Sequence, residues 1–132
     1  MIVVLDTSAV IAVVLNEPQK PRLIERTRGT ELIAPHSLPA EVGNALAAMF
    51  RRRRIVLDAA IRGFASYQQI DVRLTAIDMN RSLQLCNELG IYAYDAYMLD
   101  CALRHRCHLA TLDSRLASAA GQVGVAILDI EP

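Results

Sequence analysis

The strongest constraint on the fold of this chain is the alternation of short apolar runs with stretches of helical periodicity. Residues 2–5 are all β-branched or leucine, with no polar alternation, which is typical of a strand buried on both faces. Further strands are predicted at residues 31–34, 72–77, 109–110 and 123–128. Because helical stretches separate these strands, the pattern predicts an α/β fold: a three-layer α/β/α sandwich around a parallel sheet of four to five strands.

Capping residues and glycines delimit the helical stretches. Asp6-Thr7-Ser8 offers side chains that cap a helix, Pro39 suits the first turn of another, and Gly29 and Gly90 suit helix ends. Helices are predicted at residues 9–15, 21–28, 40–53, 57–68, 79–89, 95–103 and 114–120. No internal repeat, linker or low-complexity tract interrupts this order, so residues 1–132 are interpreted as a single domain.

Composition says more about the cellular compartment of this protein than about its function. Hydrophobic residues make up 53% of the chain, enough to build a core, and the formal net charge of zero predicts no partner by bulk charge. The cysteines, Cys86, Cys101 and Cys107, are odd in number and form no CxxC pair, which argues against a disulfide framework and favours the cytoplasm. The apolar stretch at residues 2–15 is interrupted at Asp6 and too short to span a membrane.

Four acidic residues are predicted to gather at one edge of the sheet. Asp6 directly follows the first strand, Asp113 follows the fourth, Glu41 lies in the first turn of a helix, and Asp95 lies at the start of another. In open α/β sheets, sites form at the carboxyl ends of the strands. Two carboxylates about 5 Å apart repel by roughly 3 kcal/mol at an effective dielectric constant near 20, so a cation or a raised pKa is expected.

An all-oxygen cluster of this kind favours a hard divalent cation. Mg²⁺ and Mn²⁺ prefer oxygen ligands, and either ion can activate a water and offset the charge of a phosphate. With no His or Cys beside the carboxylates, the pattern indicates phosphoryl chemistry rather than zinc peptidase chemistry. Each residue alone also has a structural explanation: Asp6 and Asp95 as helix caps, Glu41 against a helix dipole, and Asp113 in the turn before the last helix. Their joint placement favours a site.

The segments around these carboxylates resemble the motifs of the PIN-domain family, most closely its VapC-type toxins, in the same order and over nearly the whole chain. The segments are Asp6-Thr7-Ser8-Ala9, Pro39-Ala40-Glu41-Val42-Gly43-Asn44-Ala45-Leu46, Tyr94-Asp95-Ala96-Tyr97 and Thr111-Leu112-Asp113-Ser114-Arg115-Leu116. The resemblance implies an endoribonuclease that requires Mg²⁺ or Mn²⁺ and cuts RNA with an activated water. It also implies a cognate antitoxin as partner and a homodimer.

The same resemblance assigns roles to residues. Asp6, Glu41, Asp95 and Asp113 would form the catalytic, metal-binding site, with Asp6 and Asp95 as the first choices for direct ligands. Three neighbours, Thr7, Ser8 and Thr111, would orient carboxylates or water. Asn44 lies three residues after Glu41 on the same helical face, where it would touch either Glu41 or the RNA backbone.

The run Arg51, Arg52, Arg53 and Arg54 has two explanations. Basic residues are favoured at a helix C-terminus in any case, but these could also contact RNA phosphates or an acidic antitoxin segment. Arg51 is about 15 Å along the helix from Glu41, too far to take part in the chemistry.

Other features leave alternatives open. Tyr92, Tyr94 and Tyr97 surround Asp95, where they could stack on a base or pack in the core or a dimer. Dimer contacts could come from the helices that begin near residues 59 and 83. The rival functions are an RNA-maturation nuclease of the same fold, a metal-dependent phosphatase with Asp6 as nucleophile, and a binding module whose carboxylates only cap helices. The phosphatase pattern needs an acid two residues after its nucleophile, and that position holds a serine.

Overall fold

Four parallel strands form the centre of the molecule. The structure, a computed structural model, describes residues 1–131. Its strands are β1 (Ile2–Leu5), β2 (Glu31–Pro35), β3 (Val72–Thr75) and β4 (His108–Ala110). They lie in the order β3-β2-β1-β4, and each neighbouring pair is parallel. The parallel sheet predicted from the apolar runs is therefore confirmed.

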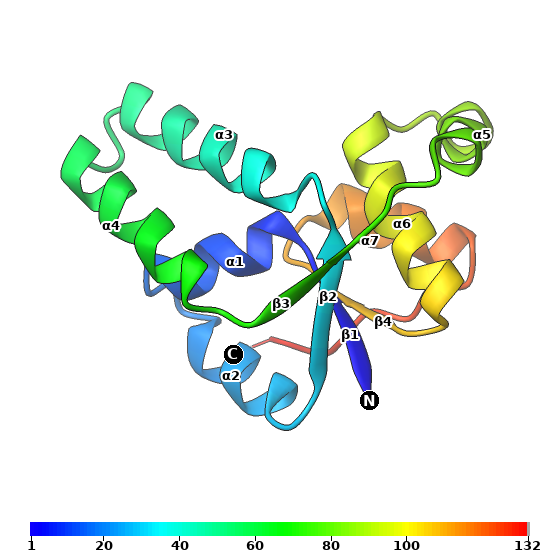
Figure 1. Cartoon of the computed structure of the whole chain (residues 1–132), viewed down its shortest axis with the longest axis horizontal. Coiled ribbons are helices and arrows are strands. Elements are labelled where there is room, and N and C mark those ends of the chain that lie inside the picture. Colours follow the sequence, from blue (N-terminus) through cyan, green and yellow to red (C-terminus); the bar gives the residue numbers. More distant parts are fainter. Residues whose placement is uncertain (132) are drawn as a thin grey trace.

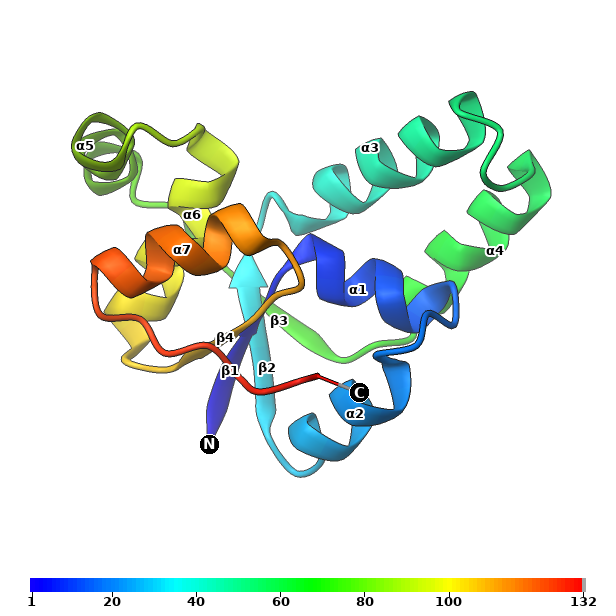
Figure 2. The same ribbon diagram turned by 180° about the vertical axis from the view of Figure 1, so that it is seen from behind.

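The helices divide between the two faces of this sheet (Figures 1 and 2). On one side lie α1 (Thr7–Val14), α2 (Lys20–Thr27), α3 (Leu38–Arg51) and α4 (Leu57–Gln68), and on the other α5 (Met79–Leu89), α6 (Ala93–His105) and α7 (Ser114–Gln122). Right-handed crossovers explain this division. From β1 to β2 to β3 the chain moves toward one edge of the sheet, and from β3 it crosses to the other edge to form β4. Because the direction of movement reverses, the helices that follow β3 cover the opposite face. The three-layer sandwich is confirmed.

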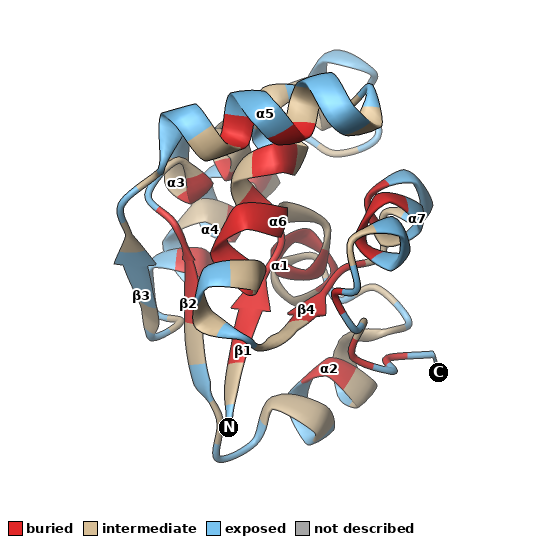
Figure 3. Ribbon diagram, turned by 90° about the vertical axis from the view of Figure 1, so that its right-hand side faces the viewer, coloured by how far each residue is buried: buried red, intermediate tan, exposed pale blue. Residues whose placement is uncertain are grey.

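The central strands, α1 and α6 form the core, and Figure 3 shows buried stretches in each of them. Val3 and Val4 of β1, Ile33 of β2 and Leu99 of α6 are fully buried. Each such side chain stabilises the fold by about 1.5–3 kcal/mol relative to exposure. The apolar runs were readable in sequence because these strands have helices on both faces. Among the described helices, none combines the length and apolar character needed to cross a membrane.

The strand predicted at residues 123–128 is wrong. Only Ile127 makes a β-bridge, with Leu109, through hydrogen bonds that flank it on either side. The preceding helix extends farther than predicted, so Val123 becomes its C-cap. Gly124 then turns the chain with a φ of 76°, and of the described residues that follow it only Ile127 forms a bridge with β4.

The helix predicted to open at Asp95 also starts elsewhere. Tyr92 is the N-cap of α6, and Asp95 lies inside its first turn. The possibility that Asp95 serves as a helix cap is therefore excluded.

The strand order reverses beside β1, and this is where a crevice opens. The chain leaves β1 toward one face and β4 toward the other, although the two strands are hydrogen-bonded neighbours. The N–H of Asp6 donates to the carbonyl of Ala110 at 3.1 Å, which fixes Asp6 beside Thr111. Such switch points are the usual binding sites of open α/β sheets.

Candidate active site

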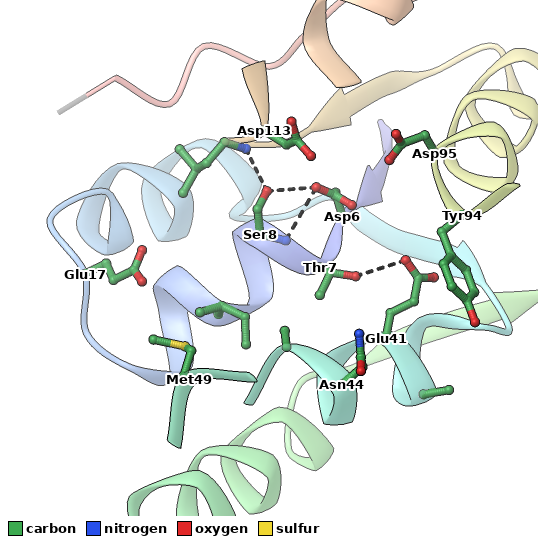
Figure 4. Close-up of a pocket in the computed structure, with 14 residues that line it drawn as sticks. Asp6, Thr7, Ser8, Glu17, Glu41, Asn44, Met49, Tyr94, Asp95 and Asp113 are labelled. Atoms are coloured by element: carbon green, nitrogen blue, oxygen red, sulfur yellow. Dashed lines mark hydrogen bonds between the residues drawn. The ribbon is translucent and has the colours of Figure 1, made fainter. Parts of the chain in front are cut away.

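One pocket at this edge of the sheet contains all four of the carboxylates singled out in the sequence. It has a volume of about 440 Å³, and Asp6, Glu41, Asp95 and Asp113 line it together. Figure 4 shows the carboxylates of Asp113 and Asp95 on either side of Asp6, while Glu41 approaches from α3. No lysine or arginine within residues 1–131 lines the pocket. The expected gathering of these four side chains is thus observed.

Asp6 is buried, and one of its carboxylate oxygens is saturated. Oδ2 accepts hydrogen bonds from the hydroxyls of Thr111 at 2.7 Å and Ser8 at 2.8 Å, and a longer one from the Ser8 N–H at 3.4 Å. The two hydroxyls in turn accept the N–H groups of Asp113 and Leu112. Oδ1 has no hydrogen-bond partner in the described part of the chain. Ser8 and Thr111 therefore hold one oxygen of Asp6 and leave the other without a hydrogen bond in the described chain.

Glu41 is held by two hydroxyls, one on each oxygen. Ser37 donates to Oε2 at 2.7 Å, and Thr7 donates to Oε1 at 3.4 Å. Burial raises the pKa of the Glu41 carboxyl, the Ser37 hydrogen bond opposes the rise, and the nearby charges of Asp6 and Asp95 add to it. Glu41 therefore holds its proton more readily than an exposed glutamate does.

Asp95 has no hydrogen-bond partner among residues 1–131. Burial is the main cause that raises the pKa of its carboxyl, the negative charges of Asp113 and Asp6 raise it further, and Arg115 opposes them. The side chain therefore faces other carboxylates without a compensating donor. Such a group is destabilising unless a proton or a cation neutralises it.

Asp113 serves the fold and faces the pocket at the same time. Its Oδ1 accepts the N–H groups of Arg115 at 2.9 Å and Leu116 at 3.3 Å, which caps α7. Its Oδ2 has no such partner in the described chain. The turn-holding explanation for Asp113 is correct, but it accounts for only one of the two oxygens.

The donor set fits a hard divalent cation. Within residues 1–131, Asp6 and Asp113 each have one oxygen without a hydrogen-bond partner, Asp95 has two, and no basic side chain lines the pocket that these residues share. Oxygen-only ligands of this charge suit Mg²⁺ or Mn²⁺. As they stand, no three acidic, histidine or cysteine side chains of residues 1–131 are gathered closely enough to hold an ion.

The other sequence candidates fall both inside and outside the pocket. Asn44 lines it and is exposed, and the structure gives it no hydrogen bond to Glu41. The arginines at positions 51 to 54 are exposed at the far end of α3 from Glu41, and none of them lines the pocket. Tyr94 lines the pocket beside Asp95, with its ring edge-on to Tyr97.

Two residues that belong to the site, Ser37 and Glu17, were not predicted from the sequence. Ser37 lies four residues before Glu41, a spacing that places both on one helical face and could have identified it. Glu17 lines the same pocket from the loop after α1, and no motif or spacing marks it. Its position depends on how that loop folds back over the sheet edge.

Comparisons with known proteins identify the fold. The PIN domain family model matches residues 3–122. The structure is similar to that of PAE2754 from Pyrobaculum aerophilum, with a TM-score of 0.72, 22% identity, and coverage of 96% of this chain and 83% of that one. It is also similar to Mycobacterium tuberculosis VapC20, a sarcin-ricin loop cleaving toxin, with a TM-score of 0.65, 15% identity, and coverage of 89% of this chain and 94% of that one. A comparison with curated protein sequences finds no match.

Proposed function

Because this chain belongs to the PIN-domain family, we propose that it is a metal-dependent endoribonuclease and the toxin of a type II toxin–antitoxin pair. The observation that carries the proposal is the pocket that Asp6, Glu41, Asp95 and Asp113 line together, with no basic residue among its lining in the described part of the chain. Support for RNA as the substrate comes from the similar fold of VapC20, a sarcin-ricin loop cleaving toxin. A phosphatase is less well supported, because Ser8 is bonded to Asp6 where a second acid would be needed.

The proposed chemistry follows from which oxygens are free. Asp6 through Oδ1, Asp113 through Oδ2 and Asp95 would hold the cation, and Ser8 and Thr111 would keep Asp6 in place. Mg²⁺ or Mn²⁺ bound there would activate a water and offset the charge of the phosphate.

Glu41 would take the proton that the attacking water loses, because burial raises the pKa of its carboxyl and makes it a stronger base than an exposed glutamate. As the water oxygen bonds to phosphorus, the bond to the leaving ribose oxygen would break, and that oxygen would take a proton from solvent water, while Glu41 would release its proton to solvent.

The test is cleavage of a mixed RNA pool in Mg²⁺, in Mn²⁺ and in EDTA, beside turnover of p-nitrophenyl phosphate. RNA should be cut with either metal and left intact in EDTA, while the small ester is not turned over. Ester turnover without RNA cleavage would favour the phosphatase class. Intact RNA in every sample, together with a melting temperature that Mn²⁺ does not change, would favour the binding module.

An apolar groove between α3 and α4 is the proposed contact for the antitoxin. Leu57 and Ile61 are 57% and 60% exposed beside Phe50 and Phe64, and Arg53 and Arg54 border the groove at its end. This arrangement suits a segment with apolar side chains next to acidic ones. We place the complex in the cytoplasm, where the free cysteines stay reduced. We also expect a homodimer, and exposed Leu83 on α5 is available for that contact.

The arginines at the end of α3 are also expected to contact RNA outside the cut. Replacing Arg51 and Arg52 by Gln should weaken the binding of single-stranded RNA at low salt, because two phosphate contacts are lost. The slope of log affinity against log salt should become shallower by up to about 1.4, at about 0.7 per contact. Fluorescence anisotropy over a salt series measures both quantities.

A matched control is the replacement of Arg26 and Arg28 by Gln. These residues lie at the corresponding end of α2, away from the pocket. The control should leave the slope unchanged. Equal slopes for all three proteins would show that the arginines at the end of α3 are only a solvated helix end.

A further inference from the structure

The pocket extends well beyond the carboxylates. In Figure 4, Glu17 and Met49 lie on the far side of Thr7 and Ser8 from Asp95. Apolar side chains line the pocket as well. Ile11 lies about one turn after Ser8 on α1, and Ala45 and Met49 lie about one and two turns after Glu41 on α3. Leu112 also lines the pocket, and its N–H donates to the hydroxyl of Ser8. This half has an apolar lining with a single carboxylate at its end, so its chemistry differs from that of the acidic half.

The backbone at Glu17 is fixed by the end of α1. Asn16 adopts the left-handed conformation with a φ of 56°, which asparagine tolerates better than most residues, and the Glu17 N–H donates to the carbonyl of Ala12 at 2.8 Å. Lys20, the nearest lysine in the sequence, donates to the side chain of Asn16 at 2.6 Å. In residues 1–131 the Glu17 carboxylate has neither a hydrogen bond nor an ion pair, so it is free to bind a ligand.

A ligand of this half is expected to carry hydrogen-bond donors and no negative charge beside Glu17. A carboxylate only accepts hydrogen bonds, and because no lysine or arginine of residues 1–131 lines the pocket, a second phosphate would be repelled. An apolar wall accommodates the flat face of a nucleobase. Bases in single-stranded RNA are commonly recognised in this way, with their Watson–Crick edge hydrogen-bonded.

Among the four bases, guanine matches a carboxylate best. Its N1–H and N2–H groups are adjacent donors, so both carboxylate oxygens can accept at once. Adenine and cytosine place a ring-nitrogen acceptor beside the amino group, and uracil flanks its N3–H with two carbonyl oxygens. Each of these three bases would therefore bring an acceptor against the negative charge of Glu17.

Building on the proposed ribonuclease function, we infer that this half of the pocket binds the base of the nucleotide next to the cut, and that Glu17 selects guanine. The distance along α3 between the carboxylate site and the apolar half of the pocket is consistent with the length of one nucleotide. Met49 lies about 12 Å along the helix from Glu41, within reach of one nucleotide whose phosphate is at the carboxylates. Asn44 lies between Glu41 and Met49 in Figure 4, where it can contact the sugar. The arginines follow at the end of the same helix.

The experiment is an NMR titration with GMP, AMP, CMP and UMP in Mg²⁺, for the wild type, Glu17→Gln and Glu25→Gln. Glu25 is the matched control, because it is an exposed glutamate on α2 that does not line the pocket. The wild type and the control should bind GMP about tenfold or more tightly than the other nucleotides, since a bidentate pair discriminates at this level. Glu17→Gln should reduce that preference to about threefold or less.

Two results overturn the inference: equal binding of all four nucleotides by the wild type, or a GMP preference that persists in Glu17→Gln. A second variant, Ala45→Leu, places a larger side chain in the apolar wall and should weaken the binding of all four nucleotides. Unchanged GMP binding in this variant would also contradict the subsite. If the ribonuclease proposal alone were wrong, the results would differ from these. RNA would remain uncut while the GMP preference still depended on Glu17, and the guanine subsite would still be supported.

Discussion

Asp6→Asn should lower the rate of RNA cleavage by about 10³-fold, equivalent to about 4 kcal/mol of lost transition-state stabilisation. The amide oxygen of Asn can replace Oδ2 and keep the hydrogen bonds from Ser8 and Thr111. Its NH₂ group then occupies the position of the free oxygen, where it repels a cation instead of binding it. The chain should remain folded, since Asn caps a helix as well as Asp does. Single-turnover cleavage of RNA in Mn²⁺ measures the effect.

The matched control for this change is Asp71→Asn, which alters an exposed carboxylate outside the pocket. This variant should cleave at the wild-type rate. A folded Asp6→Asn protein, judged by circular dichroism, that also cleaves at the wild-type rate would mean that the carboxylate pocket is not the place of the chemistry.

Mn²⁺ should raise the melting temperature of the wild type by roughly 10 °C at 100 times its dissociation constant. A ligand at that concentration adds about 2.7 kcal/mol of stability, and a chain of this size converts each kcal/mol into a few degrees. Asp95→Asn should show a much smaller rise, because Asp95 brings two unpartnered oxygens to the pocket. Differential scanning calorimetry with Mn²⁺ and with EDTA separates the two proteins, and equal rises in both would exclude Asp95 as a ligand.

Without metal, Asp95→Asn should be the more stable of the two proteins, and the difference in stability should depend on pH. The pKa of Asp95 is raised in the folded state, chiefly by burial, above its ordinary value of 3.8. At a pH between the pKa of Asp95 in the unfolded state and its pKa in the folded state, the folded state binds more protons than the unfolded state. The stability of the wild type therefore falls as the pH rises through the folded pKa. In EDTA at pH 7, Asp95→Asn should therefore be at least as stable as the wild type. Urea denaturation should show this advantage shrinking as the pH approaches 4, and an advantage that grew on acidification would contradict the assignment.

Burial alone does not identify the site carboxylates. Asp100 is only 1% exposed, less than Asp6 at 6%, yet it pairs with Arg104 at 2.9 Å on α6 and does not line the carboxylate pocket. Burial is the main cause that raises its pKa, and the Arg104 charge opposes the rise. The difference lies in the partners: Asp100 faces an arginine, whereas Asp95 faces carboxylates.

The order of elements and the gathering of the carboxylates could be predicted from the sequence alone. Strands buried on both faces appear as unbroken apolar runs, and residues that directly follow parallel strands meet at one edge, so Asp6 and Asp113 could be placed together. The last predicted strand was wrong because chain direction there depends on Gly124 and on the length of the preceding helix, which apolar periodicity does not register.

Only the tertiary structure decided which oxygens are free and what else lines the pocket. Thr111 and Asp6 are 105 positions apart, and their hydrogen bond exists because β1 and β4 are neighbours in the sheet. Glu17 joins the pocket through the fold of a loop whose sequence carries no signal of that position. Periodicity and capping are local properties of a chain, whereas the pairing of side chains across the edge of a sheet depends on strand order and loop path, which are settled only when the whole core packs.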